Sequence, residues 1–241
     1  MRKITLFLLG LSMIPSLCLA EFALISDKDG YVNVRDEASL QSGVIGRLNN
    51  GTVVSVHDGQ SNFVWVIASQ LKDGGYVHQS RINPFKDFQR WKLTGHSADQ
   101  AVYRLAQNTV TLKVKPAEFK LQDFKKSKKA DSAETGYTHY KNQIFWGTDG
   151  EIPNHALQFK QIDIVWNGKT IVIPAEKLQQ YFFPKDRLGA KYDFEQSEIY
   201  SKNNELYILN TLSTGGAAQY NLMIHLDNGQ VKTIQAWSDQ I

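Results

Sequence analysis

Cysteine is almost absent from this sequence of 241 residues, because Cys18 is the only one. It lies in the amino-terminal segment that we expect to be removed, so the mature chain has no thiol. Leu17 stands directly before it, where a lipoprotein signal needs a small residue, and we expect no lipid anchor. The lack of thiols excludes disulfide bonds and a cysteine nucleophile. Packing of one or two ordinary cores must therefore stabilise the fold.

Long hydrophobic runs are also scarce, and the only extended one lies at the start of the chain. Two basic residues precede an apolar run at residues 4–17, and the small Ala20 follows it. This order is typical of a secretory signal peptide over residues 1–20, with cleavage near Ala20. No later run is long enough to cross a bilayer, so we expect no transmembrane segment. The pattern predicts a periplasmic or secreted protein.

Charge of one sign is not in excess. The chain has 27 Lys and Arg against 24 Asp and Glu, and removal of Arg2 and Lys3 leaves 25 − 24 = +1. A nearly neutral chain lacks the electrostatic attraction that binding to nucleic acid requires. We therefore expect no nucleic-acid partner.

Motifs of the common hydrolases are missing as well. The sequence has no His-Glu-x-x-His motif, no His-x-His pair and no Gly-x-Ser-x-Gly nucleophile elbow. His139, Asp149 and His155 form the only neighbouring set of metal-ligand types, and their spacing is not that of a known zinc site. We expect no catalytic residues, no metal and no cofactor, and the chain is more consistent with a binding protein than with an enzyme.

Short runs of alternating valines are abundant in the first part of the mature chain. Valines occupy every second position at 32 and 34, at 54 and 56, and at 64 and 66. Turn segments at 49–51, 57–59 and 73–75 separate these runs, and each contains a glycine that can adopt a positive φ. Strands this short can bury one face only if the sheet curls into a barrel.

The residues of this region resemble a bacterial SH3 domain. The stretches YVNVRDEAS, SGVIGRLNNGTVVSV, FVWV and GGYVHQSRI follow the usual order of that family over residues 24–84. The sequence departs from the family at Ala38, where proline is common, and at Phe63 and Tyr76, where tryptophan is common. The resemblance implies an SH3-like β-barrel at residues 21–84 and the binding of cell-wall peptides or other peptides.

Side-chain parity identifies candidate binding residues on this barrel. If the valines face the core, every second residue of the same strands faces outward. The outer face then combines aromatic rings with an arginine, which suits an extended peptide that carries a carboxylate. The candidate ligand-binding residues are Tyr31, Asn33, Arg35, Phe63, Trp65, Tyr76 and His78.

A purely structural interpretation of the same residues is also open. Arg35 follows the last valine of its strand, so its guanidinium can donate to turn carbonyls or pair with Asp36 or Glu37. The aromatic rings, Trp65 above all, can instead pack beneath a second domain. Under that interpretation the aromatic face is not free to bind a ligand.

The remaining residues, 85–241, predict a second domain that is rich in antiparallel strands and α+β at most. Hairpin turns are expected at Asn167-Gly168, at Asn203-Asn204 and at 227–229. The segment at 175–182 suits a short helix between two prolines, and the lysine-rich segment at 125–134 suits a solvated loop. This half is loosely similar to a poorly characterised domain of bacterial periplasmic proteins, which implies no activity.

The sequence as a whole favours an exported, non-enzymatic binding protein of mainly β structure. Its SH3-like barrel would recognise a peptidoglycan peptide or a protein ligand in the cell envelope. Two alternatives stay open. The chain could be a periplasmic inhibitor or immunity-type protein that presents an edge or loop to a partner enzyme, or a cell-wall hydrolase with an unrecognised catalytic half.

Overall fold

The computed structural model describes residues 21–128, 134–184, 197–212 and 218–238. Strands dominate these residues, and their only helices are three short 3-10 turns. The mainly β fold is therefore confirmed. The signal peptide expected at residues 1–20 and residues 129–133 of the expected lysine-rich loop lie outside the described residues.

The amino-terminal strands form one curled sheet, which we call the barrel. Its spatial order is β3-β2-β6-β5-β4-β1-β7, and valines and other small apolar side chains fill its core as parity predicts. The elements are β1 (Glu21–Ile25), β2 (Tyr31–Arg35), β3 (Val44–Asn49), β4 (Val53–Gln60), β5 (Phe63–Ile67), β6 (Gly75–His78), the 3-10 turn η1 (Gln79–Arg81) and β7 (Ile82–Asn83).

The second half of the chain builds two further antiparallel sheets that pack face to face. The outer sheet has the order β16-β15-β11-β10-β9, with β17 paired to β15, and the middle sheet has the order β21-β20-β19-β18-β8. The outer sheet contains β9 (Lys92–His96), β10 (Gln100–Leu105), β11 (Asn108–Pro116), β15 (Ala156–Trp166), β16 (Lys169–Pro174) and β17 (Phe182–Pro184). The middle sheet contains β8 (Gln89–Arg90), β18 (Ser197–Lys202), β19 (Glu205–Leu212), β20 (Tyr220–Asp227) and β21 (Gln230–Trp237).

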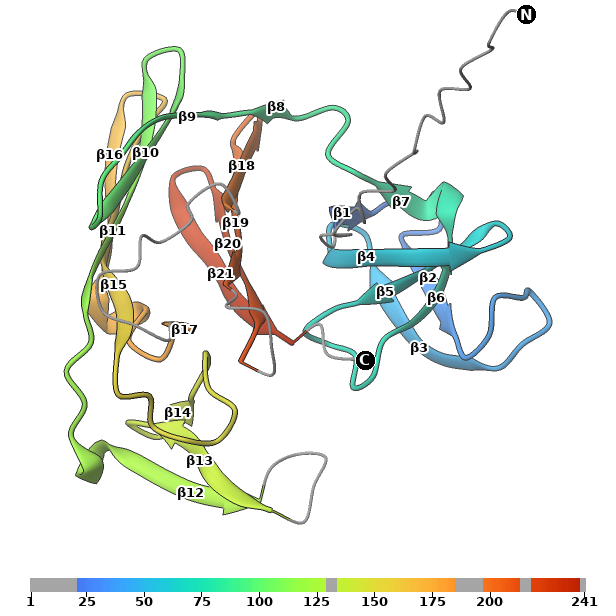
Figure 1. The fold of residues 1–241 in the computed structure, drawn as a ribbon. Coiled ribbons are helices and arrows are strands. Elements are labelled where there is room, and N and C mark those ends of the chain that lie inside the picture. Colours follow the sequence, from blue (N-terminus) through green and yellow to red (C-terminus); the bar gives the residue numbers. More distant parts are fainter. Residues whose placement is uncertain (1–20, 129–133, 185–196, 213–217, 239–241) are drawn as a thin grey trace, which may run out of the picture.

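The middle sheet is covered on both faces. Leu206 and Ile208 of β19 belong to the core shared with the outer sheet, whereas Tyr207 and Leu209 belong to a cluster shared with the barrel. Figure 1 shows the resulting order of outer sheet, middle sheet and barrel. This arrangement explains why β19 is buried along nearly its whole length, because alternate side chains enter two different cores.

A three-stranded sheet extends from the outer sheet. It consists of β12 (Phe124–Lys128), β13 (Thr135–Tyr140) and β14 (Gln143–Ile144), preceded by the 3-10 turn η2 (Leu121–Asp123). An aromatic cluster that includes Phe182 anchors this sheet to the rest of the protein. The solvated loop expected at 125–134 is therefore wrong for its first residues, because 125–128 lie in β12 and pair with β13. Their side chains are nevertheless exposed.

The expected helix at 175–182 is also wrong. Only the 3-10 turn η3 (Ala175–Lys177) forms there, and Phe182 begins β17. The apolar spacing that suggests a helix instead sends Leu178 and Tyr181 into the core between the sheets and Phe182 into the aromatic cluster. A segment of eight residues is too short for periodicity to separate a helix from a turn that leads into a strand.

The hairpin turns are confirmed. β15 pairs with β16 across Asn167-Gly168, whose φ angles are 50° and 74°. Asn203 at the β18–β19 turn and Asn228 at the β20–β21 turn both have a φ of 52°. Positive φ angles give a turn the twist of the flanking strands, and Asn and Gly adopt them most readily.

Candidate functional site

A groove opens in the barrel where two neighbouring strands separate. β2 and β6 are adjacent in the sheet, but their only paired residues are Arg35 and Tyr76. Beyond that pair lies a cavity of about 310 Å³. Its lining residues are Asp27, Asp29, Tyr31, Val32, Asn33, Arg35, Leu40, Phe63, Val77, His78, Ser80 and Arg81. Five of the seven predicted binding residues therefore share one groove, which has both aromatic and charged walls.

The aromatic wall comes from β5 and β6. Phe63 pairs with His78 in the sheet, and their rings meet edge to face with centroids 5.2 Å apart. Phe63 is only 7 % exposed, so the expectation that it points freely outward is wrong. It has the predicted parity, but the curled sheet and the His78 ring cover it. Phe63 thus contributes a buried ring to the groove instead of a protruding one.

Arg35 secures the loop between β2 and β3. Its Nη1 donates to the backbone oxygen of Ser42 at 2.6 Å, and the loop closes where the Asp36 amide donates to Gly43 at 3.1 Å. No ion pair joins Arg35 to Asp36 or Glu37 within the described residues, and the half-buried side chain still lines the groove. A guanidinium has five N–H donors. Arg35 can therefore hold the loop and also contact a ligand.

The β2 wall is supported from β3. The guanidinium carbon of Arg47 lies 4.6 Å from the centroid of the Tyr31 ring, and Arg47 Nε donates to Asn33 Oδ1 at 3.2 Å. These contacts fix the Tyr31 ring and the Asn33 amide before any ligand arrives. Preorganised side chains lose less conformational entropy when a ligand binds.

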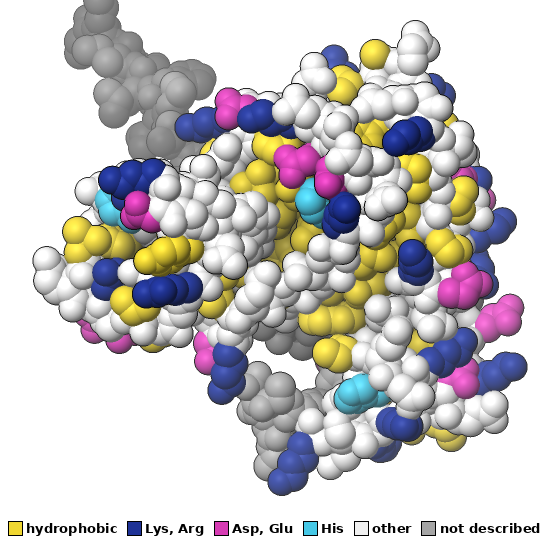
Figure 2. Space-filling view, turned by 180° about the vertical axis from the view of Figure 1, so that it is seen from behind, with side chains coloured by type: hydrophobic (Ala, Val, Ile, Leu, Met, Phe, Trp, Pro, Cys, Tyr) yellow, Lys and Arg dark blue, Asp and Glu magenta, His cyan; other side chains and the backbone are white. Residues whose placement is uncertain are grey.

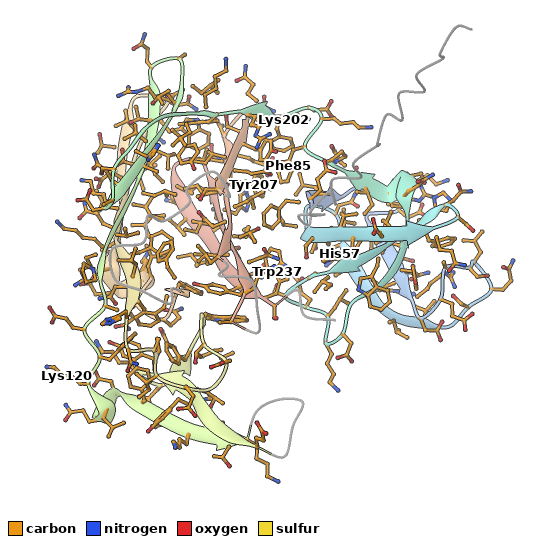
Figure 3. All side chains as sticks on the ribbon, viewed as in Figure 1. His57, Phe85, Lys120, Lys202, Tyr207 and Trp237 are labelled. Carbon is orange, nitrogen blue, oxygen red and sulfur yellow. The ribbon has the colours of Figure 1, made fainter. Side chains whose placement is uncertain are left out.

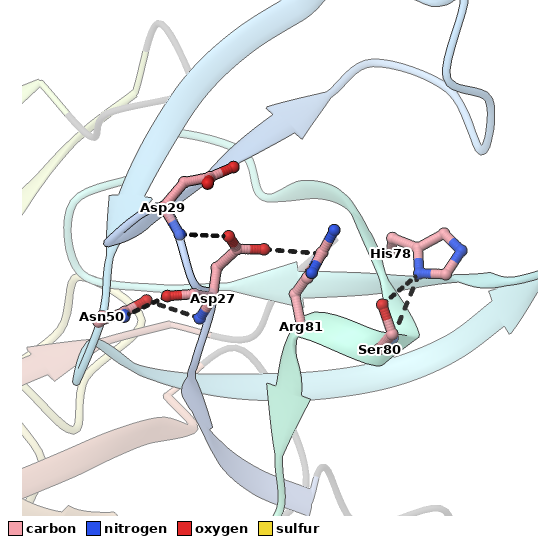
Figure 4. A network of polar contacts seen from close by, with 6 residues as sticks. All are labelled: Asp27, Asp29, Asn50, His78, Ser80 and Arg81. Carbon is pink, nitrogen blue, oxygen red and sulfur yellow. Dashed lines mark hydrogen bonds and ion pairs between the residues drawn. The ribbon is translucent and has the colours of Figure 1, made fainter.

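A polar network closes the end of the groove next to the β1–β2 turn (Figure 4). Asp27 is nearly buried and pairs with Arg81 at 2.7 Å, and its other carboxylate oxygen accepts from the Asp29 amide at 2.8 Å. Asn50 and the backbone of Asp27 exchange two further hydrogen bonds. His78 Nδ1 lies 2.8 Å from Ser80 Oγ. Asp27 therefore acts as a structural residue.

Comparison with protein families agrees with this geometry. Residues 30–83 match the family model of the bacterial SH3 domain. The bacterial SH3 domain of this chain thus includes the whole groove apart from its edge at Asp27 and Asp29. No curated protein and no solved structure was found to match the chain, and the resemblance expected for residues 85–241 has no match.

The family match gives the barrel a general role. Bacterial SH3 domains are binding modules for peptides or proteins, and they often occur in extracellular proteins. The match does not extend to the sheets of the second half. Their contribution must be inferred from their contacts with the bacterial SH3 domain.

Trp65 and Tyr76 do not line the groove. Their rings meet edge to face with centroids 5.0 Å apart, and Trp65 packs against the cluster that joins the bacterial SH3 domain to the middle sheet. The indole N–H of Trp65 is buried and has no hydrogen-bond partner among the described residues. These features agree with the structural interpretation of the sequence, in which Trp65 packs beneath the second half of the chain.

The contact between the bacterial SH3 domain and the middle sheet combines aromatic and aliphatic side chains. We call it the interface cluster, and its buried members are Phe22, Leu24, Val53, Ile67, Phe85, Tyr207, Leu209, Met223 and Trp237. Figure 3 shows Phe85, Tyr207 and Trp237 between the two sheets. Hydrophobic side chains also gather along this seam in the space-filling view of Figure 2. Sequence reasoning missed Phe85 and Trp237, because no local pattern shows which distant surface a side chain will meet.

The ring contacts of the cluster are close. Phe85 stacks on Tyr200 with centroids 4.5 Å apart and an interplanar angle of 11°. Burial raises the pKa of Tyr200 to about 12, and the nearby Glu198 carboxylate adds to the effect. The Tyr207 ring also meets Phe85 and Phe88 edge to face, with centroids 5.5 and 5.8 Å apart. The interface is therefore a packed core that fixes the bacterial SH3 domain on the middle sheet.

Within the described ranges, no group of three or more His, Cys, Asp or Glu side chains could hold a metal ion, so His139, Asp149 and His155 do not form such a group. The same residues form no helix that is long and apolar enough to span a membrane.

Proposed function

We propose that this chain is an exported, non-enzymatic protein of the cell envelope whose bacterial SH3 domain binds an extended peptide in the β2–β6 groove. The peptide would belong to the cell wall or to another envelope protein. One observation carries the proposal. None of the residues that line the groove belongs to the interface cluster, so packing on the middle sheet leaves the groove open.

The chemistry of the groove supports a peptide ligand. Tyr31 and His78 offer half-buried ring surface that a peptide can cover at low cost in side-chain entropy, and the buried Phe63 ring supports His78. Arg35 offers charge-assisted donors for a carboxylate. The volume of about 310 Å³ is at the lower end of the range for ligand pockets. A short segment of a larger ligand would fill it.

The second half of the chain would serve as a support. The interface cluster holds one side of the bacterial SH3 domain against the middle sheet, so the groove is presented in a fixed orientation. Export would follow from the signal peptide expected at residues 1–20. In that case, the mature product begins at Glu21, as a measurement of its intact mass would show, and the protein is periplasmic or secreted.

The proposal is tested by sedimentation with isolated cell wall and by pull-down from envelope extracts. Tyr31→Ala removes a groove ring, and Tyr137→Ala is a matched control. Both rings are half-buried, and each has a cation 4.6 Å from its centroid, Arg47 and Lys126 respectively. We expect Tyr31→Ala to weaken binding at least about tenfold, as loss of an aromatic anchor does, and Tyr137→Ala to leave it unchanged.

The outcomes separate the candidate functions. Equal binding by Tyr31→Ala and the wild type would contradict a role for the groove. Capture of one protein that binds both variants equally would favour an inhibitor or immunity-type protein. Release of soluble muropeptides from the wall would instead show a hydrolase.

A further inference from the structure

The charges that line the groove are separated along its length. The end next to the β1–β2 turn is lined by Asp27, Asp29 and Arg81, and the charges of these lining side chains sum to −1. Arg35 lies at the opposite end of β2, where it pairs with Tyr76. The groove therefore changes from acidic to basic along β2.

The two carboxylates of the acidic end are not equivalent. Asp27 is almost fully buried and is neutralised by Arg81. The Asp29 side chain is exposed, and its carboxylate has no hydrogen bond or ion pair with any described residue. An exposed, unpaired carboxylate that lines a groove can accept an ammonium group from a ligand. Asp29 is thus the residue available for a cation.

At the basic end, the Arg35 guanidinium has N–H donors available for a ligand. The Arg35 guanidinium uses one N–H donor on the backbone oxygen of Ser42, and the half-buried side chain lines the groove. This hydrogen bond holds the guanidinium in place, so little further entropy is lost when it binds a carboxylate. His78 is engaged with Ser80. Arg35 is therefore the cation that a ligand carboxylate can reach.

We propose that the groove selects a dipolar peptide, with an ammonium group at Asp29 and a carboxylate at Arg35. This inference rests on the proposed peptide-binding function and specifies its ligand. β2 spans about 13 Å from Tyr31 to Arg35 at about 3.3 Å per residue, and Asp29 lies two residues before Tyr31, so the ligand needs at least about five extended residues. The peptide runs parallel to β2, from ammonium to carboxylate. The charges can come from the termini or from basic and acidic side chains.

Blocked pentapeptides test the order of the charges. One begins with lysine and ends with glutamate, a second has the reverse order, and a third has glutamine at both ends. At low salt, we expect calorimetry to show that the first peptide binds about fivefold or more tightly than the other two. The expected difference is modest because each exposed ion pair contributes little free energy of binding. The difference should shrink as the salt concentration rises.

Variants of Asp29 identify the ammonium site. In Asp29→Asn, a lysine at the first position of the peptide should no longer raise the affinity, whereas a glutamate at the last position should still raise it. Asp29→Lys should reverse the preference and favour a pentapeptide with glutamate at both ends over the lysine-first peptide. Asp73→Asn is the control, because Asp73 is an exposed acidic residue of the same domain outside the groove. It should bind as the wild type does.

A second peptide pair tests the source of the charges. An alanine pentapeptide with free termini is compared with its acetylated and amidated form. Preference for the free peptide assigns the charges to termini, and preference for the lysine-first blocked peptide assigns them to side chains. Equal affinity for all peptides would overturn the dipolar groove. The dipolar groove would also be overturned if no peptide binds while Tyr31→Ala still weakens sedimentation with the wall. The proposed function would stand in that case. If Tyr31→Ala also sediments as the wild type does, both proposals fail.

Discussion

Trp237 donates its indole N–H to Ser55 Oγ at 3.0 Å, although 182 residues separate the two in sequence. Both side chains are buried. Ser55 lies in β4 of the barrel and Trp237 ends β21 of the middle sheet, so the bond joins the two halves of the protein. The Trp237 ring also meets Phe22 edge to face at 6.1 Å. These contacts predict that the two halves unfold together.

Removal of the Ser55 hydroxyl should therefore destabilise the whole protein. Ser55→Ala leaves the buried indole N–H of Trp237 without this acceptor, which costs about 1–3 kcal/mol. Urea unfolding followed by tryptophan fluorescence and by circular dichroism measures the change. We expect one transition with both probes and a lower midpoint in the variant. Two separate transitions in the wild type would contradict the coupling of the halves.

Trp65 should behave as a packing residue. Trp65→Ala removes a ring that contacts Tyr76 and the interface cluster, and we expect a loss of about 2–4 kcal/mol in the free energy of unfolding. Trp65→Phe keeps most of the ring and removes an unpaired buried donor, so it should cost much less. Wall sedimentation by Trp65→Phe should equal that of the wild type. A tenfold loss of wall binding without loss of stability would show instead that Trp65 contacts the ligand.

Arg35 is expected to stabilise the loop at 36–43. Arg35→Ala removes the hydrogen bond to Ser42, and a hydrogen bond to a charged group contributes about 1.5–3 kcal/mol. Amide hydrogen exchange should become faster in this loop, with little change in the outer sheet. Lys72→Ala, an exposed cation of the same domain, is the control. Unchanged exchange in Arg35→Ala would mean that the loop holds its conformation without the guanidinium.

The stability should depend on pH through His225. This ring stacks on Tyr207 with centroids 4.3 Å apart. Burial lowers its pKa below 6.5. Glu205 and Asp227 oppose this effect, whereas the positive charge of Lys232 also lowers the pKa. Because the folded-state pKa is lowered, the unfolded chain binds the proton first. The stabilisation is therefore present above pH 6.5 and is lost as the pH falls toward the folded-state pKa.

His225→Gln tests this dependence. The amide keeps polar character but does not titrate near neutral pH. Melting temperatures measured between pH 5 and pH 8 should fall more steeply on acidification for the wild type than for the variant. Parallel curves would show that His225 does not contribute.

Local information in the sequence was sufficient for the barrel strands and the hairpin turns, but not for β12 or β17. Alternating valines define the faces of β2 and β5, because successive side chains of a strand point in opposite directions. Asn167-Gly168 defines a hairpin, because few residues adopt two successive positive φ angles. The bacterial SH3 domain could be recognised for the same reason, since its motifs are strand and turn patterns within about sixty residues. Its candidate outer face followed directly from parity.

Tertiary contacts decided which part of that face remains available. The groove exists because β2 and β6 separate beyond Arg35 and Tyr76, and no local pattern encodes where two strands stop pairing. Trp65 and Phe63 have the same parity, yet one meets the middle sheet and the other enters the groove. The sequence by itself determined the strand faces, because they depend on neighbours along the chain. The partner of each face depends on residues as distant as Trp237, and only the packed sheets bring these together.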